Sequence, residues 1–266
     1  MREISSKDNK IYKVCEQLLV RKYRDRLGKY LIEGENLIEE AVKNGAEIET
    51  VLIRPDYDKD LGGLAEKTFV LDGRLFEHIA QTETSQGILA IVSKPEFSKE
   101  AFLSEQSRKN FIVLDRLQDP GNIGTILRTA DAAGYGLAVI MKGTVDIFSP
   151  KVVRAATGSL FRMPVVFMDS ISELVDFSRA AGRKLVATCL NAQSYYFDED
   201  LSENIALIIG NEGNGISKEL MESSDIRIKI PMHGNIESLN ASVAAGILMY
   251  ESVRGMQTNH KSNTEG

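Results

Sequence analysis

Apolar residues recur at two different spacings along the chain, and each spacing predicts a different kind of element. Residues 9–27 show helical spacing, because Ile11, Val14 and Leu18 fall on one face of a 3.6-residue helix. Helical spacing and short apolar runs continue to residue 92. They predict helices at 35–43 and 73–80 and strands at 30–33, 49–53, 69–71 and 88–92. We therefore expect a small α/β module in this part of the chain.

The second half of the chain alternates short apolar runs with amphipathic stretches. The runs are apolar at almost every position, as strands are when helices cover both faces of a parallel sheet. Predicted strands cover 111–114, 137–141, 185–188, 205–209 and 226–230, and predicted helices cover 125–133, 151–159, 172–181 and 238–254. This alternation predicts a larger α/β domain with a mostly parallel sheet and helices on both faces.

Polar segments lie between these two blocks and at the end of the chain. Residues 93–110 are mostly polar and charged and contain Pro95, which is typical of a linker. The final residues are polar as well, so we expect them to lack fixed structure. The predicted divisions are residues 1–95, a linker at 96–109, a larger domain at 110–257 and a disordered tail at 258–266.

Three of the predicted strands run directly into unusual loops. The strand at 111–115 leads into RLQDPGNIGT, the strand at 205–209 into GNEGNGIS, and the strand at 226–230 into PMHGNIESLN. The carboxyl ends of parallel strands lie along one edge of a sheet, where ligands bind. Glycine lets the backbone approach a ligand closely, and asparagine offers both a donor and an acceptor. The three loops therefore predict one ligand pocket, although each loop alone would also suit an ordinary strand–helix connection.

The loops do not match the common nucleotide-binding motifs. No segment has the GxxxxGK[ST] pattern of a phosphate-binding loop, and GNEGNG reverses the glycine spacing of the dinucleotide fingerprint. A dinucleotide-dependent oxidoreductase is therefore disfavoured. With only three histidines in 266 residues, acid–base catalysis by a histidine side chain is also disfavoured. The remaining interpretation is a pocket lined mainly by backbone groups, with one arginine nearby.

Charge and composition narrow the possible partners. The net charge is −6, but residues 1–30 carry nine basic and four acidic side chains. This local excess of +5 is either an RNA-facing surface or a solvated helix face. Cys15 and Cys189 are far apart and the histidines are scattered, so we expect no metal site and a reducing cytoplasm. No apolar run is long enough for a membrane span, and the first ten residues resemble no signal peptide.

The three loop sequences together resemble a known family. DRLQDPGNIGTILRTADAAG resembles motif 1 of the SpoU/TrmH group of RNA ribose 2′-O-methyltransferases, within the SPOUT superfamily. ALIIGNEGNGIS resembles motif 2, and IPMHGNIESLNASVAAGILMYE resembles motif 3. SPKVVRAATGSLFRMPV, from Ser149, is similar to the segment that the family has between motifs 1 and 2. The N-terminal module is similar to a substrate-binding domain with an L30e-like fold.

The resemblance implies an α/β fold whose C-terminal SPOUT domain carries a deep trefoil knot. It also implies S-adenosylmethionine as cofactor, RNA as substrate and a homodimer as the working form. The expected reaction is methyl transfer to a ribose 2′-OH, and the N-terminal module favours 23S ribosomal RNA by analogy. The alternatives are a tRNA 2′-O-methyltransferase and a non-catalytic RNA-binding assembly factor. The sequence names neither the RNA nor the nucleotide.

By resemblance, specific residues take specific roles. The expected catalytic-site residues are Arg128, Asn122, Glu212, Ser238 and Asn240. The expected cofactor-binding residues are Thr188, Asn191, Gly210, Asn211, Gly215, Ile230, Met232, Leu239 and Asn240. The expected RNA contacts are Lys13, Lys22, Arg24 and Arg154. For Ile230 and Leu239 the expected contact is through the main chain, and the alternative is that both are ordinary core residues.

The family proposal for Arg128 is that it helps to activate the ribose hydroxyl. Because a guanidinium stays protonated in proteins, we expect it to bind an RNA phosphate and to stabilise a developing alkoxide. The alternative is a surface arginine in a salt bridge. Asn122 and Ser238 would also serve as helix N-caps. Glu212 needs a partner if it is buried, and Arg128 and Arg154 are the candidates.

Overall fold

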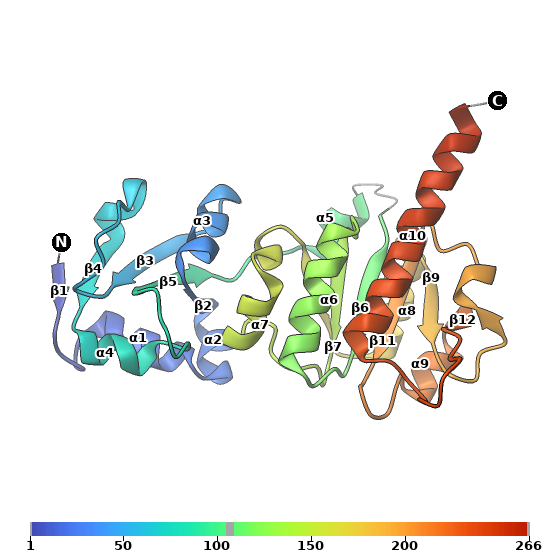
Figure 1. Cartoon of the computed structure of the whole chain (residues 1–266), viewed down its shortest axis with the longest axis horizontal. Coiled ribbons are helices and arrows are strands. Elements are labelled where there is room, and N and C mark those ends of the chain that lie inside the picture. The colour runs from blue at the N-terminus through green and yellow to red at the C-terminus, as the bar shows by residue number, and fades with distance from the viewer. Residues whose placement is uncertain (1, 105–108, 265–266) are drawn as a thin grey trace. The chain divides into compact units, whose positions relative to one another are not determined.

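The computed structural model describes residues 2–104 and 109–264 (Figure 1). Contacts divide the chain into two compact units. The first unit combines Met1–Glu96 with Asp146–Arg162, and the second combines Phe97–Val145 with Met163–Gly266.

The first unit has a five-stranded mixed sheet in the order β1-β4-β3-β5-β2. Its strands are β1 (Arg2–Ile4), β2 (Lys29–Glu33), β3 (Ile48–Ile53), β4 (Thr68–Leu71) and β5 (Ile88–Ser93). Its helices are α1 (Lys10–Leu18), α2 (Arg21–Leu27), α3 (Glu35–Lys43), α4 (Gly73–Ile79) and α7 (Pro150–Ala156), with 3-10 turns η1 (Gly62–Lys67) and η2 (Ser159–Phe161). Helices α1 and α4 supply Tyr12, Leu18 and Phe76 to a core that includes Leu52 and Leu89 of the sheet. The predicted α/β module is therefore confirmed.

The helix expected over residues 9–27 is two helices. Asn9 caps α1 by accepting a hydrogen bond from the backbone N–H of Ile11. Val20 then has extended backbone angles, with φ −107° and ψ 129°, and separates α1 from α2. Apolar spacing continues across Val20, so the periodicity did not reveal the break.

Residues 146–162 pack within the first unit, whereas the sequence placed them in the domain at 110–257. Helix α7 lies against β2, the edge strand of the five-stranded sheet. Covering an edge strand with a helix satisfies a general requirement of open sheets. Asp146 forms a buried ion pair with Arg24, and the Phe148 ring lies 4.9 Å from that of Tyr30. These contacts join positions more than 100 residues apart, which a local pattern does not show.

The second unit contains a seven-stranded sheet in which every pairing is parallel, in the order β10-β12-β9-β11-β6-β7-β8. Its strands are β6 (Phe111–Asp115), β7 (Leu137–Met141), β8 (Val165–Met168), β9 (Lys184–Thr188), β10 (Ser194–Tyr195), β11 (Ile205–Gly210) and β12 (Ile226–Lys229). The mostly parallel sheet predicted from apolar runs is confirmed.

Helices cover both faces of this sheet, as predicted. They are α5 (Lys99–Ser104), α6 (Pro120–Ala132), α8 (Ile171–Ala180), α9 (Lys218–Glu222) and α10 (Ala241–Thr264), with the 3-10 turn η3 (Tyr196–Asp198). Side chains from α5, α8 and α9 share one core cluster with the sheet. Helices α6 and α10 pack on each other on the other face (Figure 1).

The expected linker at 96–109 contributes to the core of the second unit. Phe102 in α5 is only 6% exposed, and its ring lies 5.0 Å from that of Phe111 and 6.2 Å from that of Phe177. Phe97 packs against the same cluster. The charged residues around these two phenylalanines dominated the sequence pattern and concealed a short amphipathic helix. Residues 105–108 of the expected linker lie outside the described residues.

The expected disordered tail at 258–266 is helical as far as Thr264. The chain has no proline after Pro231, so no residue is forced to interrupt the helix. The Thr258 hydroxyl donates to the carbonyl oxygen of Arg254, one turn earlier. Residues 265–266 lie outside the described residues. None of the helices in the described part of the chain combines the length and apolarity needed to cross a membrane.

Candidate active site

The loop after β6 leads directly into α6, and Asp119 forms the cap of that helix. The Asp119 carboxylate accepts a hydrogen bond of 2.7 Å from the backbone N–H of Asn122, and Pro120 occupies the first helical turn. Asn122 is therefore inside the helix and is not its N-cap. Its buried side-chain amide is available for contacts outside α6.

Glu212, in the loop after β11, binds the beginning of α6. Its carboxylate accepts hydrogen bonds from the backbone N–H groups of Gln118 (3.1 Å) and Asp119 (3.0 Å) and from Asn122 Nδ2 (3.2 Å). A carboxylate at a helix N-terminus is also stabilised by the helix dipole. The arginine partner proposed for Glu212 is therefore wrong, because backbone amides and Asn122 take that place.

The hydrogen bonds also set the charge state of Glu212. Partial burial opposes ionisation, but the bonds from backbone N–H groups and from Asn122 outweigh it. The net result is a Glu212 pKa below its usual value of 4.5. Glu212 is thus a carboxylate at neutral pH.

Asn240 connects the third loop to the same network. Its Nδ2 donates to Asn122 Oδ1 at 2.9 Å. Its Oδ1 accepts from the backbone N–H groups of Ser242 (2.9 Å) and Val243 (3.3 Å), so Asn240 caps α10. Ser238, the expected cap, precedes the helix and is exposed. Asn122 thus links Glu212 to Asn240, and the predicted convergence of the three loops is confirmed.

Arg128 lies six residues after Asn122 in α6 and is exposed. Across residues 2–104 and 109–264, no hydrogen bond or ion pair to the Arg128 guanidinium is found. Arg128 therefore does not form the surface salt bridge that was the alternative, within the residues that the structure describes. The guanidinium is available to bind an anion.

The loop after β11 turns back sharply on itself. Asn211 and Gly215 exchange two backbone hydrogen bonds, of 3.1 and 2.8 Å, and Gly215 has a left-handed φ of 64°. A Cβ at Gly210 would approach backbone atoms of Gly215 and Ile216 more closely than 3.0 Å. Only glycine fits at position 210, because the backbone of Gly215 and Ile216 fills the space that a side chain would need.

The other candidate cofactor residues lie at the ends of β9 and β12. The Thr188 hydroxyl donates to the carbonyl oxygen of Ile208 at 3.2 Å, and Asn191 is exposed. Ile230, Met232 and Leu239 are partly exposed and do not belong to the buried core. Ile230 and Leu239 are therefore not ordinary core residues. Partly exposed apolar side chains at strand ends suit an adenosine-containing cofactor.

Sequence reasoning missed Asp115 and Arg116. Asp115 is buried at the end of β6, where its carboxylate binds Arg116 Nε at 3.0 Å and the backbone N–H of Ser217 at 3.1 Å. Arg116 has a left-handed φ of 57°. The hydrogen bonds to Asp115 raise the pKa of the Arg116 guanidinium. An acidic residue that ends an otherwise apolar strand was the available signal.

The predicted RNA contacts in the first unit have different surroundings. Lys22 is exposed, and Lys13 is exposed and pairs with Asp8 at 2.8 Å. Arg24 is wrong as an RNA contact, because its side chain is 5% exposed and its Nη2 lies 2.6 Å from Asp146 Oδ2. The charge pattern placed Arg24 on a basic helix face, but its counter-ion is 122 residues away.

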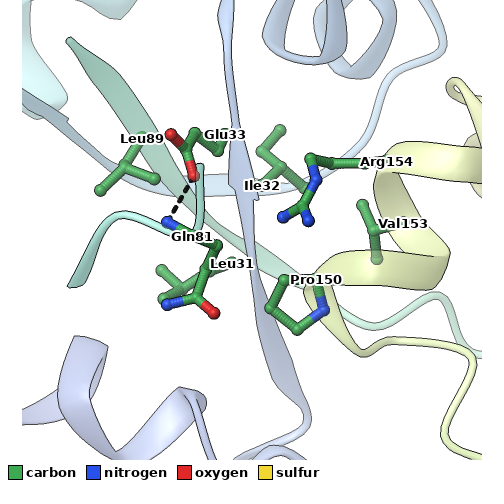
Figure 2. Close-up of a pocket in the computed structure, with 8 residues that line it drawn as sticks. All are labelled: Leu31, Ile32, Glu33, Gln81, Leu89, Pro150, Val153 and Arg154. Atoms are coloured by element: carbon green, nitrogen blue, oxygen red, sulfur yellow. Dashed lines mark hydrogen bonds between the residues drawn. The ribbon is translucent and has the colours of Figure 1, made fainter. Parts of the chain in front are cut away.

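Arg154, in α7, faces a recess in the first unit (Figure 2). The recess is lined by Leu31, Ile32, Glu33, Gln81, Leu89, Pro150, Val153 and Arg154. The Glu33 carboxylate accepts hydrogen bonds from the backbone N–H of Gln81 and from the Thr82 hydroxyl. Arg154 Nη1 is buried without a hydrogen-bond partner in the described residues. Arg154 belongs to the first unit, whereas Glu212 belongs to the second.

Fold and loop contacts together define an α/β protein in which glycine- and asparagine-rich loops meet at the carboxyl edge of a parallel sheet. Residues 109–250 match the model of the SpoU rRNA Methylase family, and residues 9–90 match the MRM3-like substrate binding domain. The chain belongs to the SpoU rRNA methylase family. It is an S-adenosylmethionine-dependent RNA methyltransferase.

Individual relatives resemble nearly the whole chain. The 23S rRNA (guanosine(2553)-2′-O)-methyltransferase RlmP of Bacillus subtilis is 37% identical over 254 residues, which are 94% of this chain and 98% of the relative. An AdoMet-bound rRNA methyltransferase from Sinorhizobium meliloti matches with a TM-score of 0.84 and 30% identity, covering 95% of this chain and 97% of the other. The SpoU methyltransferase AviRb from Streptomyces viridochromogenes, in complex with AdoMet, matches with a TM-score of 0.83 and 31% identity, covering 94% and 100%.

Proposed function

We propose that the enzyme transfers a methyl group from S-adenosylmethionine to a ribose 2′-OH in 23S ribosomal RNA. The observation that carries this proposal is the hydrogen-bonded series Glu212–Asn122–Asn240, together with the exposed guanidinium of Arg128 further along the helix that holds Asn122. The series joins the three motifs of the family in one place. The relative from Bacillus subtilis, matched over almost its full length, supports the choice of RNA.

In this proposal Arg128 contacts the RNA at the reacting nucleotide. Its guanidinium binds the phosphate next to the target ribose and stabilises negative charge as the 2′-oxygen loses its proton. It does not remove that proton, because a guanidinium stays protonated near neutral pH. S-adenosylmethionine supplies an activated methyl group when bound. Asn122, Glu212 and Asn240 hold α6 and the start of α10 in place, and the exposed Ser238 hydroxyl lies in the same loop, available to the RNA.

The cofactor is assigned to loops of the second unit. Main-chain groups of Gly210, Asn211 and Gly215 bind its polar parts, together with the main chain of Ile230 and Leu239. Thr188, Asn191 and Met232 complete the pocket. The knotted path expected for the family belongs to the same proposal, since these loops are the segments that the knot would bring together.

The working form is proposed to be a homodimer in the cytoplasm. Val243 and Tyr250 lie seven residues apart in α10, near one face of the helix, and are 51% and 52% exposed. Ile236, just before α10, is exposed as well. Large exposed apolar side chains grouped around one helix favour burial against a second copy. Lys13 and Lys22 of the first unit are proposed to contact RNA phosphates.

The decisive experiment maps 2′-O-methylated nucleotides in total RNA. A deletion strain is complemented with the wild-type gene, with Arg128→Ala or with Arg128→Lys. We expect one 23S site to be lost on deletion, restored by the wild type and not restored by Arg128→Ala. The first site to check is the guanosine that corresponds to guanosine 2553 in the 23S rRNA of the relative's name.

Other outcomes would select other functions. Loss of a tRNA site would favour the tRNA methyltransferase. If no site changes, and calorimetry detects no binding at millimolar S-adenosylmethionine, the enzyme interpretation would be refuted in favour of an RNA-binding assembly factor. Full activity of Arg128→Ala would remove Arg128 from the reaction while leaving the enzyme class intact.

A further inference from the structure

Arg116 has an unusual backbone conformation for its residue type. Its φ is 57°, in the left-handed region that glycine adopts easily and residues with a Cβ avoid. Such a conformation persists only where surrounding contacts hold it, and it is frequent at functional sites. Arg116 is the first residue after β6, at the beginning of the loop that ends at Asp119.

The guanidinium of Arg116 contacts two loops. Nε and Nη2 bind the two oxygens of the Asp115 carboxylate at 3.0 and 3.1 Å. Nη2 also donates to the carbonyl oxygen of Gly215 at 3.3 Å. The second oxygen of Asp115 accepts from the backbone N–H of Ser217. The planar guanidinium therefore connects the end of β6 to both ends of the turn at 215–217.

The main chain of Arg116 makes the same connection independently. Its carbonyl oxygen accepts from Asn211 Nδ2 and from Gln118 Nε2, both at 2.9 Å. Its N–H donates to the Thr144 hydroxyl at 3.0 Å. One residue thus contacts the loop after β6, the loop after β11 and the segment after β7. The carbonyl oxygen reaches Asn211 in the left-handed conformation described above.

We propose that Arg116 is a positioning residue that holds the turn at 210–217 in the shape that binds S-adenosylmethionine. This inference rests on the proposed cofactor site, because Gly210, Asn211 and Gly215 are its assigned main-chain contacts. Arg116 contacts this turn through Gly215 and Asn211. Its carbonyl oxygen also accepts a hydrogen bond from Gln118, whose backbone N–H, like that of Asp119, donates to Glu212. Arg116 acts through these groups and does not touch the reacting atoms.

The geometry distinguishes arginine from its closest substitutes. Lysine keeps the charge but has a single nitrogen, so it cannot bind both Asp115 oxygens and Gly215 as a planar fork does. Glycine suits the left-handed φ better than arginine but removes every guanidinium contact. If relief of backbone strain were the dominant effect, Arg116→Gly would leave binding unchanged or improve it. If the guanidinium holds the turn, both variants lose cofactor affinity.

The test measures the dissociation constant for S-adenosylmethionine by calorimetry on the full-length protein without RNA. We expect Arg116→Lys to raise the constant about tenfold, as loss of one charge-assisted hydrogen bond predicts, and Arg116→Gly to raise it at least as much. Each variant is measured well below its unfolding temperature. Arg54→Lys is the matched control, because Arg54 makes a similar two-nitrogen pair with Asp56 in the first unit, and it should leave the constant unchanged.

A second measurement separates positioning from general stability. Under saturating RNA, Arg116→Lys should raise KM for S-adenosylmethionine by about the same factor as the dissociation constant and change kcat by less. A dissociation constant within twofold of wild type for both variants would overturn the inference. If wild-type protein fails to bind the cofactor, the proposed function itself is refuted, and the two failures are thereby told apart.

Discussion

Arg24 is the residue whose assignment differs most between the sequence and the structure, and the two assignments predict opposite experiments. Its side chain is buried against Asp146, with Nε and Nη2 both within 2.7 Å of Asp146 Oδ2. Nη1 also donates to the carbonyl oxygen of Leu18 at 2.6 Å, and Asp146 Oδ1 accepts from the backbone N–H of Phe148. Every strong contact of this pair is therefore inside the first unit. An RNA contact would instead expose the guanidinium.

Replacing Asp146 by alanine leaves the Arg24 guanidinium buried without its counter-ion. Breaking a buried pair in this way costs about 3–5 kcal/mol, more than the mutual attraction of an exposed pair. At about 4 °C for each kcal/mol, the unfolding temperature of a unit of this size should fall by roughly 10–20 °C. Arg24→Met removes the charge but retains volume, and the double variant Arg24→Met/Asp146→Leu should recover most of the loss.

The assay combines differential scanning calorimetry with RNA binding at several salt concentrations. We expect Asp146→Ala to lower the unfolding temperature, while Arg24→Met/Asp146→Leu keeps the wild-type dependence of RNA affinity on salt. Lys22→Ala, an exposed neighbour, should reduce that dependence by about one phosphate contact without changing the unfolding temperature. A normal unfolding temperature in Asp146→Ala would refute the stabilising role of the ion pair, and a reduced salt dependence in the double variant would show that Arg24 contacts RNA.

Three further predictions concern the second unit. Gly210→Ala should abolish detectable S-adenosylmethionine binding in calorimetry. Gly213→Ala, whose Cβ would meet its nearest atom at 3.7 Å, should bind normally. Equal binding by the two variants would contradict the close approach of the Gly215 and Ile216 backbone to Gly210. Folding lowers the Glu212 pKa, so the stabilising effect of the ionised carboxylate is complete above its usual pKa of 4.5. That effect is lost as pH falls through the lower folded value. Urea unfolding should therefore separate wild type from Glu212→Gln at pH 7 and not at pH 2, and a constant difference would argue against an ionised Glu212. Phe102→Ala should destabilise this unit by about 3–5 kcal/mol, and a silent substitution would restore the linker interpretation.

The sheet of the second unit was predictable because its strands are apolar at nearly every position. Glycine- and asparagine-rich loops after three of these strands then indicated one pocket at their carboxyl ends. Cap positions were harder to assign, since Asp119 and Asn122 are both good N-cap residues, as are Ser238 and Asn240. Only the geometry shows which member of each pair ends up capping the helix. Asp119 caps α6 and Asn240 caps α10, so the Asn122 side chain is available to bind Glu212 and Asn240.

Contacts between distant parts of the chain were not predictable from local patterns. Arg24 looks like one basic residue among several until Asp146 is placed beside it. Phe102 looks like an isolated apolar residue in a charged segment until Phe111 and Phe177 surround it. Arg116 carries no sequence signal for a left-handed φ, because glycine and asparagine are the residues that normally announce one. In each case a partner more than five residues away decides the role.

The first unit is discontinuous in sequence, and this affects how such enzymes can exchange substrate specificity. A chimera that transfers only residues 1–96 from a relative would place a foreign side chain opposite Asp146 and a foreign strand beneath α7. Functional recombination would therefore have to carry residues 146–162 along with the N-terminal segment. Families that diversify by swapping recognition modules should then show paired inheritance of these two stretches, although the chain separates them by about fifty residues.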